Sequence, residues 1–157
     1  MPNILCKVSS QSSIPVCFFT YGIKQSISSE NIEIREKNPV IESFFSDINV
    51  LILPSIFEGC PNVLFEALLR KKICIVSKGA NSDCFIQNGV NGFVYDGTDN
   101  GLFQALQTVQ RLFYTHKANE IINNAYHYAV NNFSISTMIA EYENLFLKIY
   151  EENKSSN

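Results

Sequence analysis

The sequence predicts an α/β protein in which helices flank a parallel β-sheet. Two short segments, residues 50–53 and 73–76, are wholly apolar, as expected for parallel strands that are buried on both faces. The stretch between them has the start signal of a helix at Pro61 and Asn62. A strand, a helix and a second strand within about 30 residues form a βαβ unit, whose crossover is almost always right-handed.

Two further strands and a helix are predicted upstream of residue 50. Residues 15–21 are β-branched and aromatic, and residues 31–35 alternate between polar and apolar types, so both segments are typical of strands. Asn38 and Pro39 then form a helix start, with a capping residue followed by a first-turn proline. The apolar face of this helix consists of Ile41, Phe44, Phe45 and Ile48.

The C-terminal part of the chain is predicted to be mostly helical. After a turn at residues 88–92 and a short strand at 93–95, three segments carry apolar residues at helical spacing. The first is capped by Thr98 or Asp99, and the third opens at Ser134 or Ser136. The apolar face of the third helix consists of Met138, Ile139, Tyr142, Leu145, Phe146 and Ile149. With the upstream strands, we expect one sheet of roughly four parallel strands.

Size and composition indicate one globular domain over residues 1–157, with mobile ends at 1–13 and 152–157. The chain is 46% hydrophobic and 17% charged with a net charge of −3, which argues against a nucleic-acid or anionic-membrane binder. It has no apolar run of the roughly 18 residues that cross a bilayer and no signal-like N-terminus, so we expect a cytoplasmic protein with at most peripheral membrane contact. Its five cysteines include no C-x-x-C pair, and neither a disulfide framework nor a metal site is predicted.

The segment that follows residues 50–53 is the predicted ligand site. A short loop holds Glu58 beside Gly59, and the helix that Pro61 opens carries Glu66 in its second turn. Open α/β sheets bind ligands at the carboxyl ends of their strands, which is where this loop must lie. Free amides at a helix start attract phosphate oxygens, so the residues after Gly59 are predicted to form a phosphate cradle.

These residues carry a resemblance to a known family. The pattern Pro54-Ser55-x-x-Glu58-Gly59-x-Pro61-Asn62-Val63-x-x-Glu66-Ala67 resembles the E-x7-E signature of GT-B glycosyltransferases, in particular glycosyltransferase family 4, the group 1 type. Residues 79–83 and 88–94 resemble two further family segments in the family order, and the three together are highly specific. Lys71 stands where the family usually has glycine, and Asp83 where it usually has glutamate. The likeness runs from about residue 31 to residue 150 and implies the Rossmann-like C-terminal, donor-binding lobe of a GT-B enzyme, incomplete at its N-terminal end.

The resemblance implies a role for each residue of the motif. Glu66 would hold the ribose hydroxyls of a nucleotide, and Glu58, the predicted catalytic residue, would lie near the donor sugar. The remaining donor-binding residues would line the diphosphate crevice, mainly through backbone groups: Ser55, Gly59, Pro61, Asn62, Val63 and Gly79. Simpler alternatives remain open, since Glu66 could be an exposed helical glutamate, Glu58 or Asn62 a helix cap, and Ser55 only the end of a strand.

The resemblance also implies an activity. It is the transfer of a hexosyl group from a UDP- or GDP-sugar to a glycan or lipid-linked acceptor, as in polysaccharide biosynthesis, with retention and with neither metal nor cofactor, the nucleotide-sugar being the substrate. The chain has no room for the N-terminal acceptor lobe. It also lacks the Gly-x-x-x-x-Lys-Gly segment whose cation stabilises the departing diphosphate. We therefore expect activity to need that lobe, which is either missing from this sequence or supplied by a companion chain, and we expect apolar surface near residues 16–20 to be left for an association.

A function without turnover is the alternative. The same residues could belong to a truncated transferase that serves as a binding or assembly module, because the cations that assist diphosphate departure are missing from the expected pattern. A dinucleotide-dependent oxidoreductase is disfavoured, since no G-x-G-x-x-G follows any predicted strand.

Overall fold

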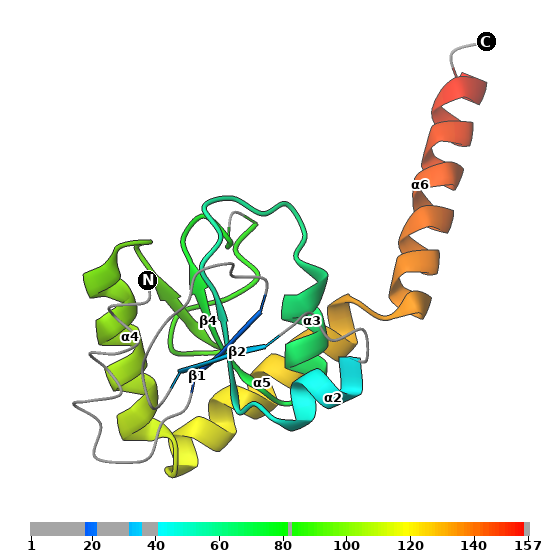
Figure 1. The fold of residues 1–157 in the computed structure, drawn as a ribbon. Helices are drawn as coiled ribbons and strands as arrows, with labels where there is room; N and C mark the ends of the chain where they lie inside the picture. Colours follow the sequence, from blue (N-terminus) through cyan, green and yellow to red (C-terminus); the bar gives the residue numbers. More distant parts are fainter. Residues whose placement is uncertain (1–17, 22–31, 36–40, 82, 156–157) are drawn as a thin grey trace.

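The computed structural model describes residues 18–21, 32–35, 41–81 and 83–155, and its ribbon is drawn in Figure 1. The strands are β1 (Phe18–Tyr21), β2 (Ile32–Arg35), β3 (Val50–Leu53), β4 (Ile73–Ser77) and β5 (Phe93–Tyr95). The helices are α2 (Ile41–Ser46), α3 (Asn62–Leu69), α4 (Asp99–Leu112), α5 (His116–Asn132) and α6 (Ile135–Ser155).

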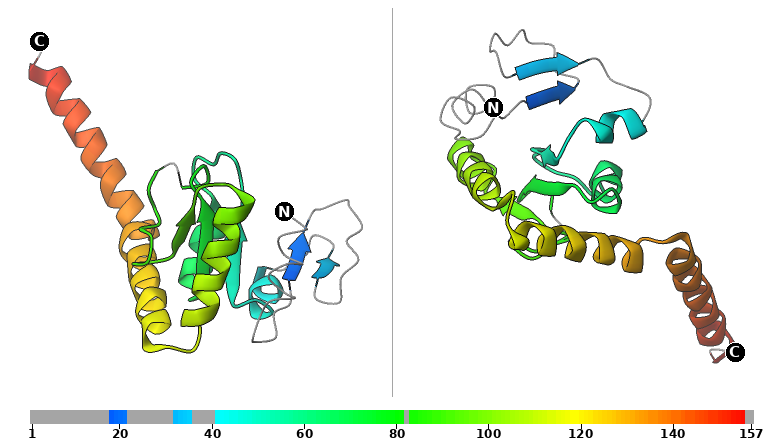
Figure 2. Two further views of the ribbon diagram at one scale, coloured as in Figure 1. Left: turned by 90° about the vertical axis from the view of Figure 1, so that its left-hand side faces the viewer. Right: turned by 90° about the horizontal axis from the view of Figure 1, so that it is seen from below.

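The strands form two parallel sheets. The larger sheet has the order β3-β4-β5, with Leu51 opposite Cys74 and Ile75 opposite Phe93. The smaller sheet pairs β1 with β2, and Figure 2 shows this pair apart from the larger sheet. The α/β class and the parallel strands are thus confirmed. The single sheet of roughly four strands is wrong, because β3 pairs with β4 alone among the described strands.

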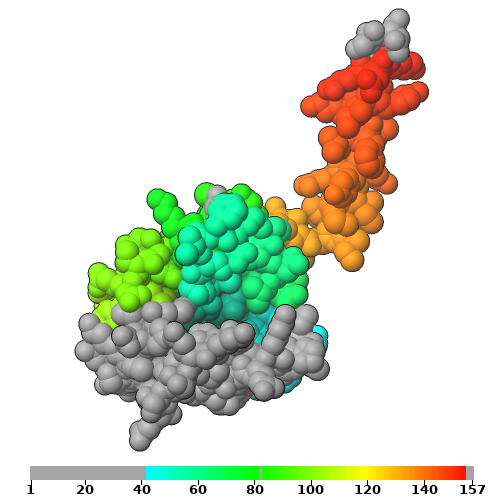
Figure 3. Space-filling model, turned by 45° about the horizontal axis from the view of Figure 1, so that its top comes forward, coloured from blue at the N-terminus to red at the C-terminus, as the bar shows by residue number. Residues whose placement is uncertain are grey.

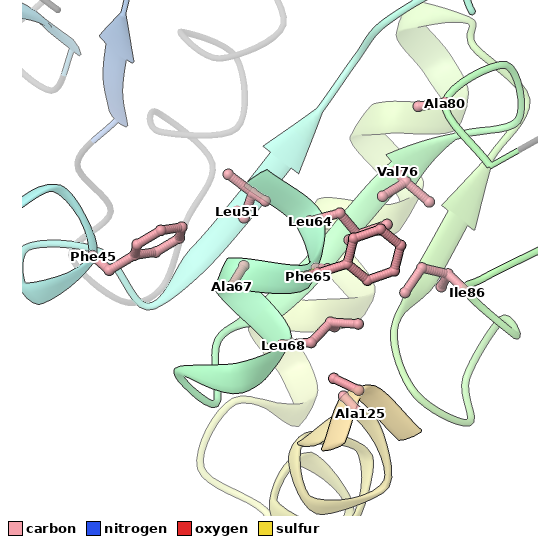
Figure 4. Close-up of a cluster of buried hydrophobic side chains, with 12 residues drawn as sticks. Phe45, Leu51, Leu64, Phe65, Ala67, Leu68, Val76, Ala80, Ile86 and Ala125 are labelled. Carbon is pink, nitrogen blue, oxygen red and sulfur yellow. The ribbon is translucent and has the colours of Figure 1, made fainter. Parts of the chain in front are cut away.

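Two apolar clusters cover the two faces of the larger sheet. Successive side chains of a strand point to opposite faces, so β4 contributes alternately to each cluster and is buried at every position. On one face, Ile73 and Ile75 pack with β5, α4 and the first half of α5. On the other face, β4 and Leu51 pack with α3 and the second half of α5 (Figure 4). Helix α5 therefore contributes to both clusters.

Strand β3 was expected to be buried on both faces, but it lies at the edge of the larger sheet among the described strands. Leu51 is buried, but Val50, Ile52 and Leu53 are only half-buried, because β3 has one hydrogen-bonded neighbour among the described strands. Val50 and Ile52 pack against one cluster and Leu51 and Leu53 belong to the other, so both faces of β3 still make apolar contacts. On β4, burial raises the pKa of the Cys74 thiol and makes it an unreactive part of the core.

Helix α3 ends in a turn that places a lysine in the left-handed conformation. Lys71 has φ +56°, and its N–H donates to the Leu68 carbonyl at 3.0 Å. The N–H of Lys72 donates to the Ala67 carbonyl at 2.9 Å, which completes a Schellman motif. The ammonium of Lys71 lies 5.0 Å from the ring centroid of Tyr126 on α5. Glycine is the usual residue at such a position, so the backbone at Lys71 is strained.

Helix α4 begins with the predicted threonine cap. The Thr98 hydroxyl accepts from the Gly101 N–H at 3.0 Å. Asp96 then fixes the cap, because its Oδ1 accepts from the Thr98 hydroxyl at 2.7 Å and from the Thr98 N–H at 2.9 Å. These bonds, that from the hydroxyl first, hold the pKa of Asp96 below its ordinary value.

Helix α6 leaves the body of the protein as a projecting arm (Figure 1). Its first turn is capped by Ser134, whose hydroxyl accepts from the Thr137 N–H at 3.1 Å. It continues to Ser155 and so includes residues 152–155 of the end that was predicted to be mobile. The predicted apolar face is present but exposed, whereas such a face normally packs against a core. None of the helices in the described ranges is both long and apolar enough to cross a bilayer.

Some expectations concern residues outside the described ranges. These include the helix start at residues 38–40, the first residues of the 15–21 strand and the N-terminal segment 1–13. The apolar surface expected near residues 16–20 also falls outside the described side chains. Within the described part, α2 ends at Ser46, so Ile48 lies beyond the helix, although both Phe45 and Ile48 contact the apolar cluster around α3.

Candidate functional site

The start of α3 lies at the carboxyl ends of β3 and β4, as the sequence predicts. Pro61 is the extended N-cap residue, with φ −77° and ψ 100°, and Asn62 is the first helical residue. The predicted proline thus sits one position earlier than expected, and Asn62 is not the cap. The Leu64 N–H donates to the Pro61 carbonyl at 2.9 Å. Within the described ranges, the N–H groups of Asn62 and Val63 have no backbone acceptor, so they remain available for a ligand.

The loop between β3 and α3 is fastened to the turn that follows β4. The Ser77 hydroxyl donates to the Ser55 carbonyl, and the Glu58 N–H donates to the Gly79 carbonyl at 3.3 Å. Gly79 also lies directly against the backbone of Ile56. A Cβ atom at Gly79 would be 2.6 Å from the Ile56 carbonyl carbon and nearer still to its oxygen. Gly79 is therefore required by its close approach to the Ile56 backbone, and it lies beside the loop that holds Glu58.

Two buried asparagines hold the chain beyond that turn, and their role was missed by the sequence reasoning. The Asn81 side chain accepts from the Ile86 N–H and donates to the Ile86 carbonyl, both at 2.8 Å. The Asn91 side chain accepts from the Gln87 N–H at 2.7 Å and donates to the Phe85 carbonyl at 3.1 Å. Asn91 lies in the segment predicted to be a turn, and Asn81 lies in the 79–83 segment that resembles the family. A buried carboxamide needs such partners, but only the fold shows which backbone groups supply them.

The two motif glutamates occupy different parts of the site. Glu58 is half-buried in the loop, next to the exposed Gly59. Glu66 is half-buried in α3, about 6 Å along the helix axis from Asn62. In the described part of the chain the carboxylate of Glu66 has no cation or hydrogen-bond donor, while its backbone carbonyl accepts from Arg70.

One basic residue at this edge was also missed. Lys78 directly follows β4 and precedes Gly79, and its N–H donates to the Tyr95 carbonyl at 2.7 Å. Its side chain is exposed. The signal in the sequence was its place immediately before the Gly79 segment, at the carboxyl end of a predicted strand.

A hollow of about 470 Å³ lies elsewhere on the protein, beside β5, α4 and the start of α5. None of the predicted site residues lines it. The α3 start has the better chemistry for an anionic ligand, because it combines open N–H groups with the positive end of a helix dipole.

Comparison with known proteins finds similarity to glycosyltransferases and to a protein of polysaccharide biosynthesis. The family described as glycosyl transferases group 1 matches residues 20–111. The UDP-Gal:alpha-D-GlcNAc-diphosphoundecaprenol alpha-1,3-galactosyltransferase of Escherichia coli is 27% identical over 99 residues, 63% of this chain and 25% of that protein. The Vi polysaccharide biosynthesis protein VipC/TviE of Salmonella typhi is 39% identical over 67 residues, 41% of this chain and 11% of that protein.

Solved structures share the fold. A glycosyltransferase from Rickettsia africae superposes with a TM-score of 0.76 at 21% identity, over 96% of this chain and 42% of that one. Anabaena Alr3699/HepE in complex with UDP gives 0.75 at 17% identity, over 93% and 44%. These matches confirm a partial GT-B architecture. The chain spans a quarter or less of the curated relatives and less than half of these two structures.

The family match covers more than half of the chain and includes the whole β3–α3–β4 unit with the Glu58 to Glu66 motif. On this basis, the chain belongs to the group 1 glycosyltransferase family.

Proposed function

We propose that this chain is the donor-binding lobe of a family 4 glycosyltransferase and binds a UDP- or GDP-type nucleotide-sugar at the start of α3. One observation carries the proposal. The open N–H groups of Asn62 and Val63 lie at the carboxyl edge of the sheet, with the half-buried Glu66 about one helical turn further along. Family membership supports this assignment, as do the nucleotide-sugar in the E. coli relative's name and the UDP complex of the Anabaena protein.

Each predicted residue has a part in this proposal. The diphosphate lies against the N–H groups of Asn62 and Val63, where the helix dipole stabilises its charge. Pro61 keeps the first turn open towards the ligand, and Gly59 lets the phosphate approach the loop backbone. The Ser55 hydroxyl donates to a phosphate oxygen. Gly79 allows the loop backbone at Ile56 to pack directly against the turn after β4, which positions the loop.

The two glutamates hold hydroxyl groups. A carboxylate accepts two hydrogen bonds at once, so Glu66 can bind both hydroxyls of the ribose. Glu58 binds a hydroxyl of the donor sugar and orients its anomeric carbon. The fixed N–H groups stabilise the charge that develops on the departing diphosphate, and Lys78 adds a positive charge at the same edge. This scheme uses no metal and no cofactor, and we propose retention of configuration.

In this proposal, the acceptor is bound by an N-terminal lobe that is not among the residues described above. That lobe lies outside the residues of this sequence or on a partner chain, and the transferred group is a hexosyl unit that passes to a glycan or lipid-linked acceptor. The names of the two curated relatives favour a role in surface polysaccharide biosynthesis.

Calorimetry on the full chain tests the donor site. UDP and GDP are titrated at up to millimolar concentration, and heat is expected with one of them. Loss of the charge-assisted bonds from Glu66 would cost about 1.5–3 kcal/mol, so Glu66→Ala should weaken binding about tenfold or more. Glu120→Ala is the control, because Glu120 is exposed on α5 and pairs only with Lys117 in the described part. Absence of nucleotide binding, or equal affinity in Glu66→Ala, would refute the donor site.

A second candidate function is binding without turnover. The observation that favours it is that none of the basic residues stands in the Gly-x-x-x-x-Lys-Gly pattern whose cation stabilises the departing diphosphate. In this case the chain binds nucleotide but transfers no sugar even when the neighbouring protein is added. Release of free sugar from a nucleotide-sugar by this chain alone would exclude this candidate.

A further inference from the structure

The loop of residues 54–60, here called the donor loop, is not held by the main-chain ladder of the sheet. The paired register of β3 and β4 ends with Leu53 opposite Val76. The next residue of the loop is Pro54, which has no N–H group with which to extend the ladder. Figure 3 turns this edge of the sheet towards the viewer and shows the turquoise loop at the surface of the body. Other contacts must therefore fix the position of the donor loop.

Three contacts join the donor loop to the segment that follows β4. Two of them involve backbone atoms alone: the Glu58 N–H donates to the Gly79 carbonyl, and the Ile56 backbone lies against Gly79. The third is the bond from the Ser77 hydroxyl to the Ser55 carbonyl. Of the three, only this bond depends on a side chain. A substitution at Ser77 therefore removes one contact and leaves the groups that make the other two in place.

The hydrogen bonds of Ser77 fix the direction of its hydroxyl proton. Ser77 is buried, with only 2% of its surface exposed, and its hydroxyl oxygen accepts from the Ala80 N–H at 3.0 Å. An amide N–H can only donate and a carbonyl can only accept, so the single hydroxyl proton is directed to Ser55. The Ser77 carbonyl also accepts from the Asn81 N–H at 3.1 Å. Ser77 thus connects the donor loop to the turn after β4.

The two halves of the candidate site are held by different means. Helix α3, which carries Glu66 and the open N–H groups, is anchored in the core by four buried side chains: Leu64, Phe65, Ala67 and Leu68. The donor loop carries Ser55 and Glu58, and it depends on the contacts with the segment after β4. Loss of the Ser77 hydroxyl should therefore displace the loop half of the site and leave the helix half in place.

From these contacts we propose that Ser77 is a positioning residue of the donor site. Its hydroxyl sets the position of the donor loop, and thereby the positions of the Ser55 and Glu58 side chains. This inference rests on the proposed function, which assigns those two side chains to a phosphate oxygen and to the donor sugar. Ser77 is buried and acts only through the loop. A displacement of about 1 Å is enough to impair groups that must be placed accurately against a ligand.

Amide hydrogen exchange of the full chain, followed by NMR without ligand, tests whether Ser77 holds the loop. Ser77→Ala should speed exchange of the Glu58 N–H about tenfold, because the loop opens more often. Thr98→Ala is the matched control, since it removes another hydroxyl, one that accepts from the Gly101 N–H at the start of α4. It should leave exchange at Glu58 unchanged. Equal exchange at Glu58 in Ser77→Ala and the wild type would overturn the proposal.

Calorimetry tests the consequence for binding, with UDP or GDP as the probe, whichever binds the wild type. Ser77→Ala should raise the dissociation constant about five- to tenfold. Ser77→Thr keeps the hydroxyl and should recover most of the affinity, and Thr98→Ala should bind as the wild type does. Circular dichroism confirms that each variant folds.

The outcomes separate the two proposals. A wild type that binds neither nucleotide refutes the donor site itself. A wild type that binds, with an unchanged dissociation constant in Ser77→Ala, overturns the role of Ser77 alone. The same holds if folded Ser77→Thr binds as weakly as Ser77→Ala, or if Thr98→Ala weakens binding as much, because the loss would then not depend on the Ser77 hydroxyl.

Discussion

Replacing Gly79 by alanine tests how the candidate site is held together. A Cβ atom at this position would lie 2.6 Å from the Ile56 carbonyl carbon and closer to the oxygen. The loop would have to withdraw by about 1 Å or more before the contact reached an ordinary distance of about 3.4 Å. That movement would break the bond from the Glu58 N–H to the Gly79 carbonyl and strain the bond from Ser77 to Ser55.

The expected loss of stability follows from these contacts. Overpacking of this kind costs about 1–3 kcal/mol, and a lost hydrogen bond about 1 kcal/mol. Alanine also restricts the conformations of the unfolded chain, which stabilises the folded state by about 0.5–1 kcal/mol. The net expectation for Gly79→Ala is a loss of about 2 kcal/mol, which lowers the Tm of a chain of this size by about 6 °C.

Urea and thermal unfolding followed by circular dichroism give the measurement. Gly59→Ala is the control, because Gly59 lies in the same loop and a Cβ there would meet nothing within 4 Å. Its stability should stay within about 0.5 kcal/mol of the wild type. The reasoning is refuted if Gly79→Ala is as stable as Gly59→Ala.

Three further predictions concern other parts of the structure. Lys71→Gly should be about 1 kcal/mol more stable than Lys71→Ala in urea unfolding, because both lose the contact with Tyr126 and only glycine relieves the left-handed backbone; equal stability would contradict this. Asp96 has a lowered pKa, so its contribution to the free energy of unfolding is present above the ordinary pKa range of a carboxyl group and is lost as the pH falls. The Tm of Asp96→Ala should therefore lie below that of the wild type near neutral pH and converge with it in acid. A difference in Tm that stays constant with pH would refute the assignment. Asn81→Ala should lower the free energy of unfolding by about 2–3 kcal/mol, since it leaves two buried backbone groups without partners, and a loss below about 1 kcal/mol would show that water replaces the carboxamide.

Sequence reasoning succeeded where the signals are local. The apolar runs of β3 and β4 and the proline at the start of α3 lie within one continuous stretch, so the βαβ unit and the start of α3 could be predicted with errors of about one residue. The threonine cap of α4 is equally local, because it depends on Thr98 and the turn that follows it.

The errors concern contacts between distant parts of the chain. The pattern of β1 and β2 indicates strands but does not specify which strand pairs with β3, and the structure forms two sheets. The periodicity of α6 identifies its apolar face, but no pattern within a helix indicates whether another element covers that face. The structural roles of Asn81 and Asn91 were not predicted, because their backbone partners become neighbours only after folding.

The position of α5 has a consequence for how the protein unfolds. Ala118 and Ile121 belong to the cluster on one face of the larger sheet, and Ala125 and Ala129 to the cluster on the other. One helix thus covers part of both apolar clusters. If α5 detaches from the sheet, both clusters become exposed to solvent together. Probes placed on opposite sides of β4 should therefore report a single cooperative melting transition.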